Sequence, residues 1–309
     1  MKRILVTGGT GFIGQHLMDH LRQRGFEIHV IGRHRPSDTQ VTFHEADVLD
    51  LNRTRQAIVS AKCSHLLHLA WYVKPGEYWR SPNNLDWIAA SLHLIRSFAE
   101  NGGSRAVIAG TCAEYLWGAE RFLEQETPCR PATLYGTSKD ALRRILTAYG
   151  DVASLSVGWG RIFFLYGPGE KQGRLVSDAI HHLLLKQPFS TSHGLQRRDF
   201  MHVSDVAGAF AALVDCDVRG AVNIGSGQAF SVRSILELIG QATGASDFLR
   251  FGERPLPANE PEVIEADTAR LFGEVGFRPR YDLASGLADT IFWWRQHNYP
   301  ASLTSSERV

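Results

Sequence analysis

A tyrosine and a lysine four residues apart give the first sign of chemistry in this chain. Tyr135 and Lys139 open the segment 135–146, whose apolar residues recur with helical spacing, so both side chains lie on one helix face. A phenol is a weak acid with a pKa of about 10, but a neighbouring ammonium favours its ionised form and lowers that pKa. The spacing predicts a proton-transfer pair.

A hydroxyl follows an apolar run upstream of this pair. Residues 105–109 predict a strand, and Thr111 comes shortly after it. Doubly wound sheets bind their ligands at the carboxyl ends of the strands, so Thr111 is placed to hydrogen-bond the oxygen that reacts with Tyr135. The alternative is a structural threonine that closes the strand. The predicted catalytic residues are Thr111, Tyr135 and Lys139.

A glycine-rich turn near the amino terminus predicts a phosphate site. Residues 7–14 read TGGTGFIG, directly after the apolar run 4–6 and before a helical pattern. Glycines at every third position form a tight turn whose amides meet a pyrophosphate at a helix N-terminus. The spacing is GxxGxxG rather than GxGxxG. The predicted cofactor contacts here are Gly8, Gly11, Phe12, Ile13 and Gly14.

The end of the second predicted strand bears on the choice of dinucleotide. NAD sites place an acid about 20 residues beyond the glycines, where it accepts bonds from the ribose 2′-hydroxyl. Residues 30–35 read VIGRHR and hold no carboxylate. Arg33 and Arg35 could instead pair with a 2′-phosphate. The sequence therefore favours NADP, with Arg33 as a cofactor contact and NAD as the less favoured alternative.

Strand-like and helix-like segments alternate through the first half of the chain. Strands are expected at 4–6, 27–31, 65–70, 105–109, 153–162 and 221–224, and helices at 12–24, 51–61, 85–100 and 204–214. This alternation predicts an α/β fold with a Rossmann doubly wound parallel sheet. We expect residues 1–165, with 201–225 returning to them, to form the dinucleotide-binding domain. Residues 166–200 and 226–309, richer in turns, are expected to form a smaller substrate-binding lobe.

The composition limits the classes of partner. The 309 residues are 44% hydrophobic with a net charge of +1, which indicates a globular protein and offers no electrostatic case for nucleic acid or a membrane surface. The four cysteines show no CxxC spacing, so we expect no metal site and no disulfide framework. With no apolar run of membrane-spanning length, the sequence predicts a cytoplasmic protein.

Together these motifs resemble the extended short-chain dehydrogenase/reductase family of nucleotide-sugar epimerases, dehydratases and reductases. The resemblance covers nearly the whole chain, in the family's order, through TGGTGFIG, Asp47, His68-Leu69-Ala70, Thr111, Tyr135 and Lys139, Arg161, Tyr166-Gly167-Pro168-Gly169, the run RDFMHV at 198–203 and NIGSG at 223–227.

The resemblance implies further roles for individual residues. Asp47 and Val48 would lie near the adenine, and Leu69 and Ala70 would line the cofactor. Lys139 would also hold the nicotinamide ribose. Arg198 and Arg254 would reach the diphosphate or nucleotide end of a nucleotide-sugar substrate. Phe164 stands where many relatives carry an asparagine for the substrate phosphate. Because dimers are common in the family, the resemblance also implies a homodimer. All of these residues are read from the printed sequence.

The residues after Thr111 separate the possible reactions. Relatives that dehydrate sugars resemble one another in placing an acid pair there, whereas this chain has Cys112 and Ala113, and Glu114 should face elsewhere. Two redox reactions stay open. The NADP reading favours NADPH-dependent reduction of a nucleotide-linked 4-keto-6-deoxy sugar, with Tyr135 as proton donor. The alternatives are a 4-epimerase that retains its cofactor and, more remotely, a non-catalytic NADP-binding sensor.

Overall fold

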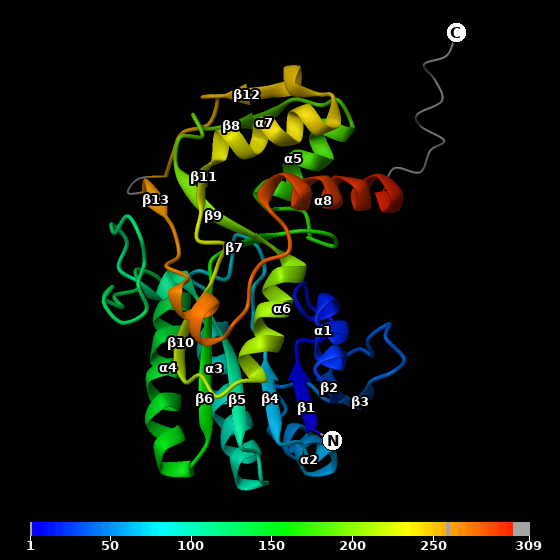
Figure 1. The fold of residues 1–309 in the computed structure, drawn as a ribbon, viewed down its shortest axis with the longest axis vertical. Helices are drawn as coiled ribbons and strands as arrows, with labels where there is room; N and C mark the ends of the chain where they lie inside the picture. Colours follow the sequence, from blue (N-terminus) through cyan, green and yellow to red (C-terminus); the bar gives the residue numbers. More distant parts are fainter. Residues whose placement is uncertain (1, 258–259, 299–309) are drawn as a thin grey trace.

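A seven-stranded parallel sheet forms the centre of the computed structural model, which describes residues 2–257 and 260–298. Its strands are β1 (Lys2–Thr7), β2 (Phe26–Gly32), β3 (Thr42–Glu45), β4 (His65–His68), β5 (Arg105–Thr111), β6 (Ser156–Ile162) and β10 (Gly220–Ile224). Their order is β10-β6-β5-β4-β1-β2-β3. The chain starts in the middle of the sheet and builds outward on both sides (Figure 1). The predicted fold class is therefore confirmed.

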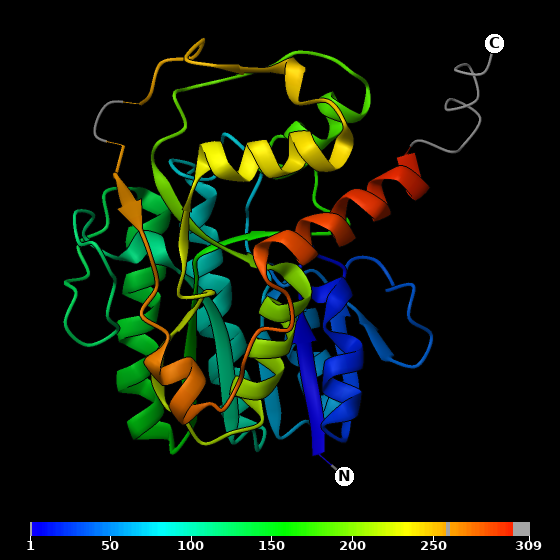
Figure 2. The same ribbon diagram turned by 45° about the horizontal axis from the view of Figure 1, so that its top comes forward.

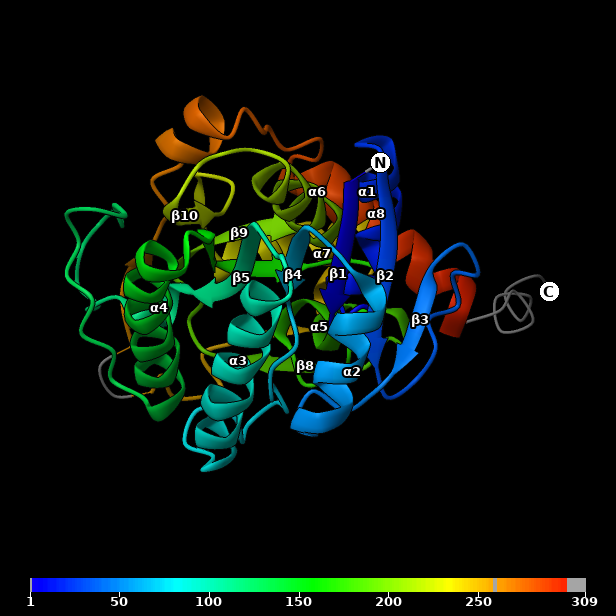
Figure 3. The same cartoon turned by 90° about the horizontal axis from the view of Figure 1, so that it is seen from below.

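Helices cover both faces of this sheet. They are α1 (Met18–Gln23), α2 (Leu51–Ala61), α3 (Asn83–Glu100), α4 (Leu134–Ala153) and α6 (Val203–Val214). Ile58, Leu94 and Leu142 from α2, α3 and α4 share one core with the sheet, while Leu21 and Phe210 from α1 and α6 share another. Seen from below, α2, α3 and α4 lie on one side of the strands and α1 and α6 on the other (Figure 3).

Burial on both faces explains why the strands read as continuous apolar runs. Every residue of β5 is buried. The sequence located six of the seven strands. It did not identify β3, which lies at the sheet edge, pairs only with β2 and is half-buried or exposed along its length. The helix expected at 12–24 is shorter, because residues 8–13 form the glycine turn and only a 3-10 turn at Gly14–His16 precedes α1.

Most of the remaining described chain forms a smaller lobe above the carboxyl ends of the strands (Figure 2), while the helical turn Arg270–Glu274 packs Leu271 against the large sheet. The lobe contains β7 (Phe164–Tyr166), β8 (Phe189–Thr191), β9 (Arg197–His202), β11 (Ala229–Ser231), β12 (Leu249–Phe251), β13 (Val263–Ile264), α5 (Leu175–Leu184), α7 (Val232–Thr243) and α8 (Leu283–Asn298). β9 pairs with β7, β11 and β13. Ile180, Ile235 and Leu287 belong to its separate core. The domain limits given above stay a prediction, and residues 299–309 lie outside the described ranges.

Among residues 2–257 and 260–298, the helices bear on membrane spans, and the His, Cys, Asp and Glu side chains bear on metal centres. No helix in those ranges combines the length and the apolarity needed to cross a bilayer. The same ranges hold no group of three or more His, Cys, Asp or Glu side chains that could bind a metal ion.

Candidate active site

A cleft of about 2270 Å³ lies between the sheet and the smaller lobe. Its floor is made by the segments that follow β1, β2, β3, β4, β5 and β6, so it lies at the carboxyl edge of the sheet, where doubly wound folds bind ligands. Single small-molecule pockets commonly occupy about 300–1,000 Å³. This volume can therefore hold a dinucleotide together with a second ligand.

The glycine turn forms one wall of the cleft and leaves no room for side chains. A Cβ on Gly14 would lie 2.2 Å from the carbonyl oxygen of Gly8, and one on Gly8 would lie 2.8 Å from the amide nitrogen of Ala70. Gly8 also has a φ of +75°, which favours glycine. Phe12, Ile13, Leu69 and Ala70 line the cleft beside the turn. This bare backbone cradle fits a pyrophosphate.

The segments after β2 and β3 meet at the same end of the cleft. Ala46 donates its amide to the carbonyl of Gly32 across 3.0 Å, which brings Asp47 and Val48 beside Arg33, and all three residues line the cleft. Arg33 is exposed, and it has no ion-pair partner among the residues that the structure describes. The arginine is thus available to an anionic ligand.

Tyr135 and Lys139 lie side by side at the start of α4. Thr133 caps this helix by accepting the Gly136 amide at 3.1 Å, so the first turn is fixed against the sheet. Both side chains are buried, with 8% and 3% of their surface exposed, and both line the cleft. Lys139 donates from Nζ to the carbonyl oxygen of Ala109 at 2.8 Å. The structure therefore brings the sequence-predicted pair together.

The electrostatics of the pair differ from the sequence expectation. Burial raises the pKa of Tyr135, the neighbouring Tyr78 adds to the rise, and a hydrogen bond with Thr111 opposes it. Burial lowers the pKa of Lys139 to about 7, against a smaller opposing effect of Glu114. The expectation of a lowered phenol pKa is wrong for this structure, because burial disfavours the phenolate. Tyr135 is a neutral phenol at pH 7.

Thr111 ends β5 and faces the cleft beside Tyr135. Its Oγ1 accepts the Ala113 amide at 3.2 Å, and both Thr111 and Tyr135 line the cleft. Only 8% of Thr111 is exposed. The structural role and the catalytic role expected for Thr111 thus both have a geometric basis. Thr111 caps the following 3-10 turn, Cys112–Glu114, and it presents a hydroxyl to the site.

Glu114 points away from the cleft into the sheet. Its side chain is fully buried, and its Oε2 accepts from Arg161 Nε at 2.8 Å. Its Oε1 accepts from Trp159 Nε1 and from the Thr111 amide, each at 2.9 Å. The carboxylate is therefore part of the scaffold behind Thr111. This agrees with the expectation that Glu114 faces away from the position that an acid pair would need.

The two arginines assigned to the substrate lie in different surroundings. Arg198, on β9, is 3% exposed, lines the cleft and pairs with Glu260. Its guanidinium lies 5.8 Å from the centre of the Phe164 ring. Arg254 is exposed, and the described cleft lining does not include it. The structure brings Arg198 to the site and leaves Arg254 outside the cleft.

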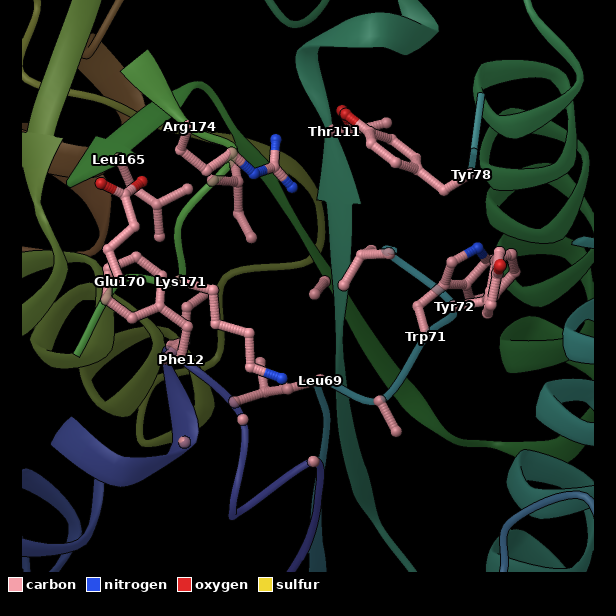
Figure 4. Close-up of a pocket in the computed structure, with 18 of the residues that line it drawn as sticks. Phe12, Leu69, Trp71, Tyr72, Tyr78, Thr111, Leu165, Glu170, Lys171 and Arg174 are labelled. Carbon is pink, nitrogen blue, oxygen red and sulfur yellow. The ribbon is translucent and has the colours of Figure 1, made fainter. Parts of the chain in front are cut away.

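Sequence reasoning missed several residues that line the cleft. Arg174 caps α5 and projects across the cleft toward Thr111 and Tyr78 (Figure 4). Glu170 lies on the same bank, and burial raises the pKa of its carboxyl to about 8. Four aromatic rings lie between β4 and α3, and the density of aromatic residues in 71–79 was the one available signal: the rings are Trp71, Tyr72, Tyr78 and Trp79.

Curated relatives match the chain over most of its length. It is 27% identical to UDP-glucuronic acid decarboxylase 1 of Xenopus tropicalis, over 96% of this chain and 72% of the relative. It is 25% identical to UDP-glucose 4-epimerase of Neisseria meningitidis serogroup B, over 95% of this chain and 97% of the relative. Both relatives are named as enzymes that act on nucleotide sugars.

Solved structures share the fold. MoeE5 in complex with UDP-glucose and NAD is 30% identical, with a TM-score of 0.81 over 95% of this chain and 99% of that one. The UDP-glucose 4-epimerase of Thermus thermophilus in complex with NAD is 25% identical, with a TM-score of 0.84 over 96% and 99%. Residues 4–225 match the model of the NAD dependent epimerase/dehydratase family. With its glycine cradle, its Tyr135 and Lys139 pair and this match, the chain belongs to that family of enzymes.

Proposed function

We propose that the protein reduces a nucleotide-linked 4-keto-6-deoxy sugar with NADPH. The observation that carries the proposal is the grouping of Thr111, Tyr135 and Lys139 at the cleft while Glu114 is locked behind it. Elimination of water needs an acid and a base at the sugar. Since Cys112 and Ala113 follow Thr111 and the next carboxylate faces the sheet, a ketone reduction fits this site better than a dehydration.

The residues of the chain would divide the proton chemistry. Tyr135, a neutral phenol in this setting, would donate its proton to the oxygen formed at C4. Thr111 would donate a hydrogen bond to the same oxygen. Lys139, with a pKa near neutrality, would supply positive charge beside the phenol as it ionises. A nicotinamide dinucleotide bound on the glycine turn would supply the hydride.

The cofactor preference rests on the end of β2. Arg33 lines the cleft beside Asp47 and Val48, and no carboxylate occurs in residues 30–35. A guanidinium would pair with a 2′-phosphate through charge-assisted bonds. Asp47 and Val48 would contact the adenine, with Leu69 and Ala70 along the cofactor. The NAD in the solved relatives keeps NAD as the alternative.

For the substrate, we propose that Arg198 holds the diphosphate. It is buried in the cleft wall, and relatives are named for UDP-linked sugars. Arg254 would need the loop that carries it to move before it could take part, because it stands outside the cleft lining.

A homodimer is part of the proposal. The helices α3 and α4 expose Leu85, Ile145 and Val152, with 58%, 47% and 86% of their surfaces accessible. Two neighbouring helices with exposed apolar residues offer a surface that a second copy could cover. Light scattering coupled to size-exclusion chromatography would measure the mass in solution. A monomer at micromolar concentration would remove this part of the proposal.

The second candidate is a 4-epimerase that keeps its cofactor. It is favoured by the 25% identity to a UDP-glucose 4-epimerase across 95% of this chain. The first experiment is therefore to follow nicotinamide absorbance with NADPH and NADH against a panel of nucleotide-linked 4-keto-6-deoxy sugars. Stoichiometric NADPH oxidation supports the reductase. Interconversion of 4-hydroxy epimers with no net oxidation would replace it by the epimerase.

Tyr135→Phe tests whether the protein is an enzyme or a sensor. Loss of the phenolic proton should lower turnover by about 10²–10⁴-fold, while dinucleotide binding, measured by calorimetry, stays within a few fold. An unchanged biological effect of the variant would favour the non-catalytic sensor.

A further inference from the structure

The segment 71–79, between β4 and α3, lines the cleft with Trp71, Tyr72, Tyr78 and Trp79. Figure 4 shows Trp71, Tyr72 and Tyr78 together on one bank, next to Thr111. Trp71 and Tyr78 are buried, with 8% and 6% exposed, whereas Trp79 keeps 39% of its surface accessible. This bank of the active site is therefore largely aromatic.

Both members of the catalytic pair contact this segment. The ammonium of Lys139 lies 3.7 Å from the centre of the Trp71 ring. The ring of Tyr135 meets Tyr78 at 4.9 Å and Trp79 at 5.7 Å between centres, edge to face in each case. Tyr135 also donates its amide to the Trp79 carbonyl at 3.2 Å. A ligand that takes the Tyr135 proton must lie within a hydrogen bond of it, so its neighbouring atoms meet these rings.

Two of the four rings have their polar atoms engaged within the protein, and a third faces a guanidinium. Trp71 donates from Nε1 to Asn84 at 2.9 Å. The Tyr72 hydroxyl donates to Glu77 at 2.8 Å, and the Arg174 guanidinium lies 5.5 Å from the centre of the Tyr78 ring. A buried donor that has a partner gains little by exchanging it for a ligand. What the segment offers to a ligand is therefore aromatic surface.

Asn84 holds the segment in place. Its side chain is fully buried, its Oδ1 accepts from Trp71, and its Nδ2 donates to the carbonyls of Tyr78 at 2.8 Å and Ser81 at 2.9 Å. One amide thus ties both ends of the segment to the start of α3. Its loss would leave a buried indole donor and two carbonyls without their partner.

The opposite bank carries aromatic rings beside the charged side chains of Glu170, Lys171 and Arg174. Phe164 and Phe200, whose ring centres are 5.4 Å apart, line the cleft from β7 and β9. A sugar between the banks would meet aromatic surface on both sides. Carbon-bound hydrogens and methyl groups lose no hydrogen bonds when they lie against the rings, whereas a hydroxymethyl group placed against the rings would leave its water partners without replacement.

Resting on the proposed function, we propose that segment 71–79, positioned by Asn84, determines which sugar the protein accepts. It selects a sugar that carries a methyl group where an ordinary hexose carries hydroxymethyl. Tyr78 and Trp79 are the specificity-determining residues, and Asn84 is a positioning residue that acts through them.

Binding rather than turnover tests this proposal. Protein saturated with oxidised dinucleotide is titrated calorimetrically with a nucleotide-linked 6-deoxyhexose and with the matching hexose of the same nucleotide. The wild-type protein should bind the deoxy sugar roughly 10–100-fold more tightly, the range that one apolar-to-hydroxyl difference reaches in a hydrophobic pocket. In Trp79→Ala and Asn84→Ala this ratio should fall to within about threefold of unity, with affinity for the free nucleoside diphosphate unchanged.

Asn101 supplies a matched control, because it lies at the other end of α3 and donates from Nδ2 to the Ser97 carbonyl at 2.8 Å. Asn101→Ala should keep the wild-type ratio. Near-ultraviolet circular dichroism checks that Asn84→Ala folds. If Asn84→Ala does not fold, Trp79→Ala, which removes only a part-exposed ring, still tests the proposal. Equal binding of the two sugars by wild type, or tighter binding of the hexose, would overturn the specificity proposal alone. A retained deoxy preference without any turnover would overturn the proposed function alone.

Discussion

Arg161 donates a 2.8 Å hydrogen bond from Nε to Oε2 of Glu114 at a point where both side chains are closed off from solvent. The other carboxylate oxygen accepts the amide of Thr111. The ion pair therefore forms the back of the active site, and the hydroxyl at its front depends on a carboxylate that lies outside the described lining of the cleft.

Removing that carboxylate should cost stability and activity together. Glu114→Ala would leave the Arg161 guanidinium buried without its counterion, and we expect a loss of about 3–5 kcal/mol in the free energy of unfolding. Urea denaturation measures it. Arg121→Ala breaks the exposed pair with Glu265 and should cost less than about 1 kcal/mol. Similar losses in the two variants would contradict the assignment of Glu114 to the scaffold.

The buried Glu170 should make stability depend on pH. Its pKa is about 8 in the fold against an ordinary 4.5, because burial disfavours the carboxylate more than Arg174 stabilises it. The folded state then holds the proton more tightly than the unfolded chain, so the free energy of unfolding falls as pH rises from about 4.5 to about 8. Between pH 5 and 7 the loss should reach at most about 3 kcal/mol.

Glu170→Gln should remove the part of the pH dependence that Glu170 contributes, because the amide does not titrate, while histidines with lowered pKa values such as His68 and His202 keep theirs. Denaturation curves at pH 5, 6 and 7 compare the variant with the wild type and with Glu100→Gln, a control at an exposed helix end. A difference between wild type and Glu170→Gln that stays level over this range would show that Glu170 is already ionised in the fold.

Arg33 should govern the choice between the two dinucleotides. Arg33→Ser would remove the guanidinium that we assign to the 2′-phosphate, which is worth about 1.5–3 kcal/mol. NADPH affinity should fall by roughly 10–100-fold while NADH affinity changes little, as fluorescence titration of the reduced cofactors would reveal. Arg53→Ser, on exposed α2, is the control. Equal loss for both cofactors would refute a role in recognising the phosphate.

Arg198 and Arg254 should differ in their effect on substrate affinity. Arg198 lines the cleft and Arg254 does not. We therefore expect Arg198→Ala to weaken binding of a nucleoside diphosphate by about 10–100-fold, in line with the loss of a charge-assisted hydrogen bond. Arg254→Ala should bind nearly as the wild type does. If calorimetry finds the stronger loss in Arg254→Ala, its loop must close over the ligand.

Gly14 should tolerate no side chain. A Cβ there would lie 2.2 Å from the Gly8 carbonyl oxygen and 2.7 Å from Gly9. Gly14→Ala should lose about 1–3 kcal/mol of stability through overpacking and lose dinucleotide binding with it. Gly273→Ala, where an added Cβ meets nothing within 4 Å, is the control. Thermal melts with and without cofactor would separate the loss of stability from the loss of binding. A cofactor-induced rise in the melting temperature of Gly14→Ala as large as that of the wild type would contradict the tight turn.

The sequence predicts the parts of this molecule that local patterns encode. The glycine turn, the parallel strands and the Tyr135 and Lys139 pair each occupy a short stretch with a regular period, so residue spacing alone identifies them. The family resemblance and the enzyme class follow from those motifs, and the family match over residues 4–225 confirms both.

The remaining features depend on contacts between distant residues. β9 is held by three short strands from separate parts of the chain, and none of them is long enough to show a period. The link from Trp71 to Asn84 and the environment of Glu170 likewise arise only on packing. The raised pKa of Tyr135 could not be predicted, because the sequence shows that a lysine is near but does not show how deeply the phenol is buried.

The chain passes between the large sheet and the smaller lobe at residues 162–164, 202–203, 224–229, 264–271 and 277–283. A hinge concentrates rotation in a few loop or element-terminal residues. Here several short connections would have to change their backbone angles at the same time. We therefore expect the lobes to stay nearly fixed during turnover. Ligand exchange would then be gated by surface loops at the mouth, and its rate should respond to substitutions in those loops far more than to substitutions at the connections.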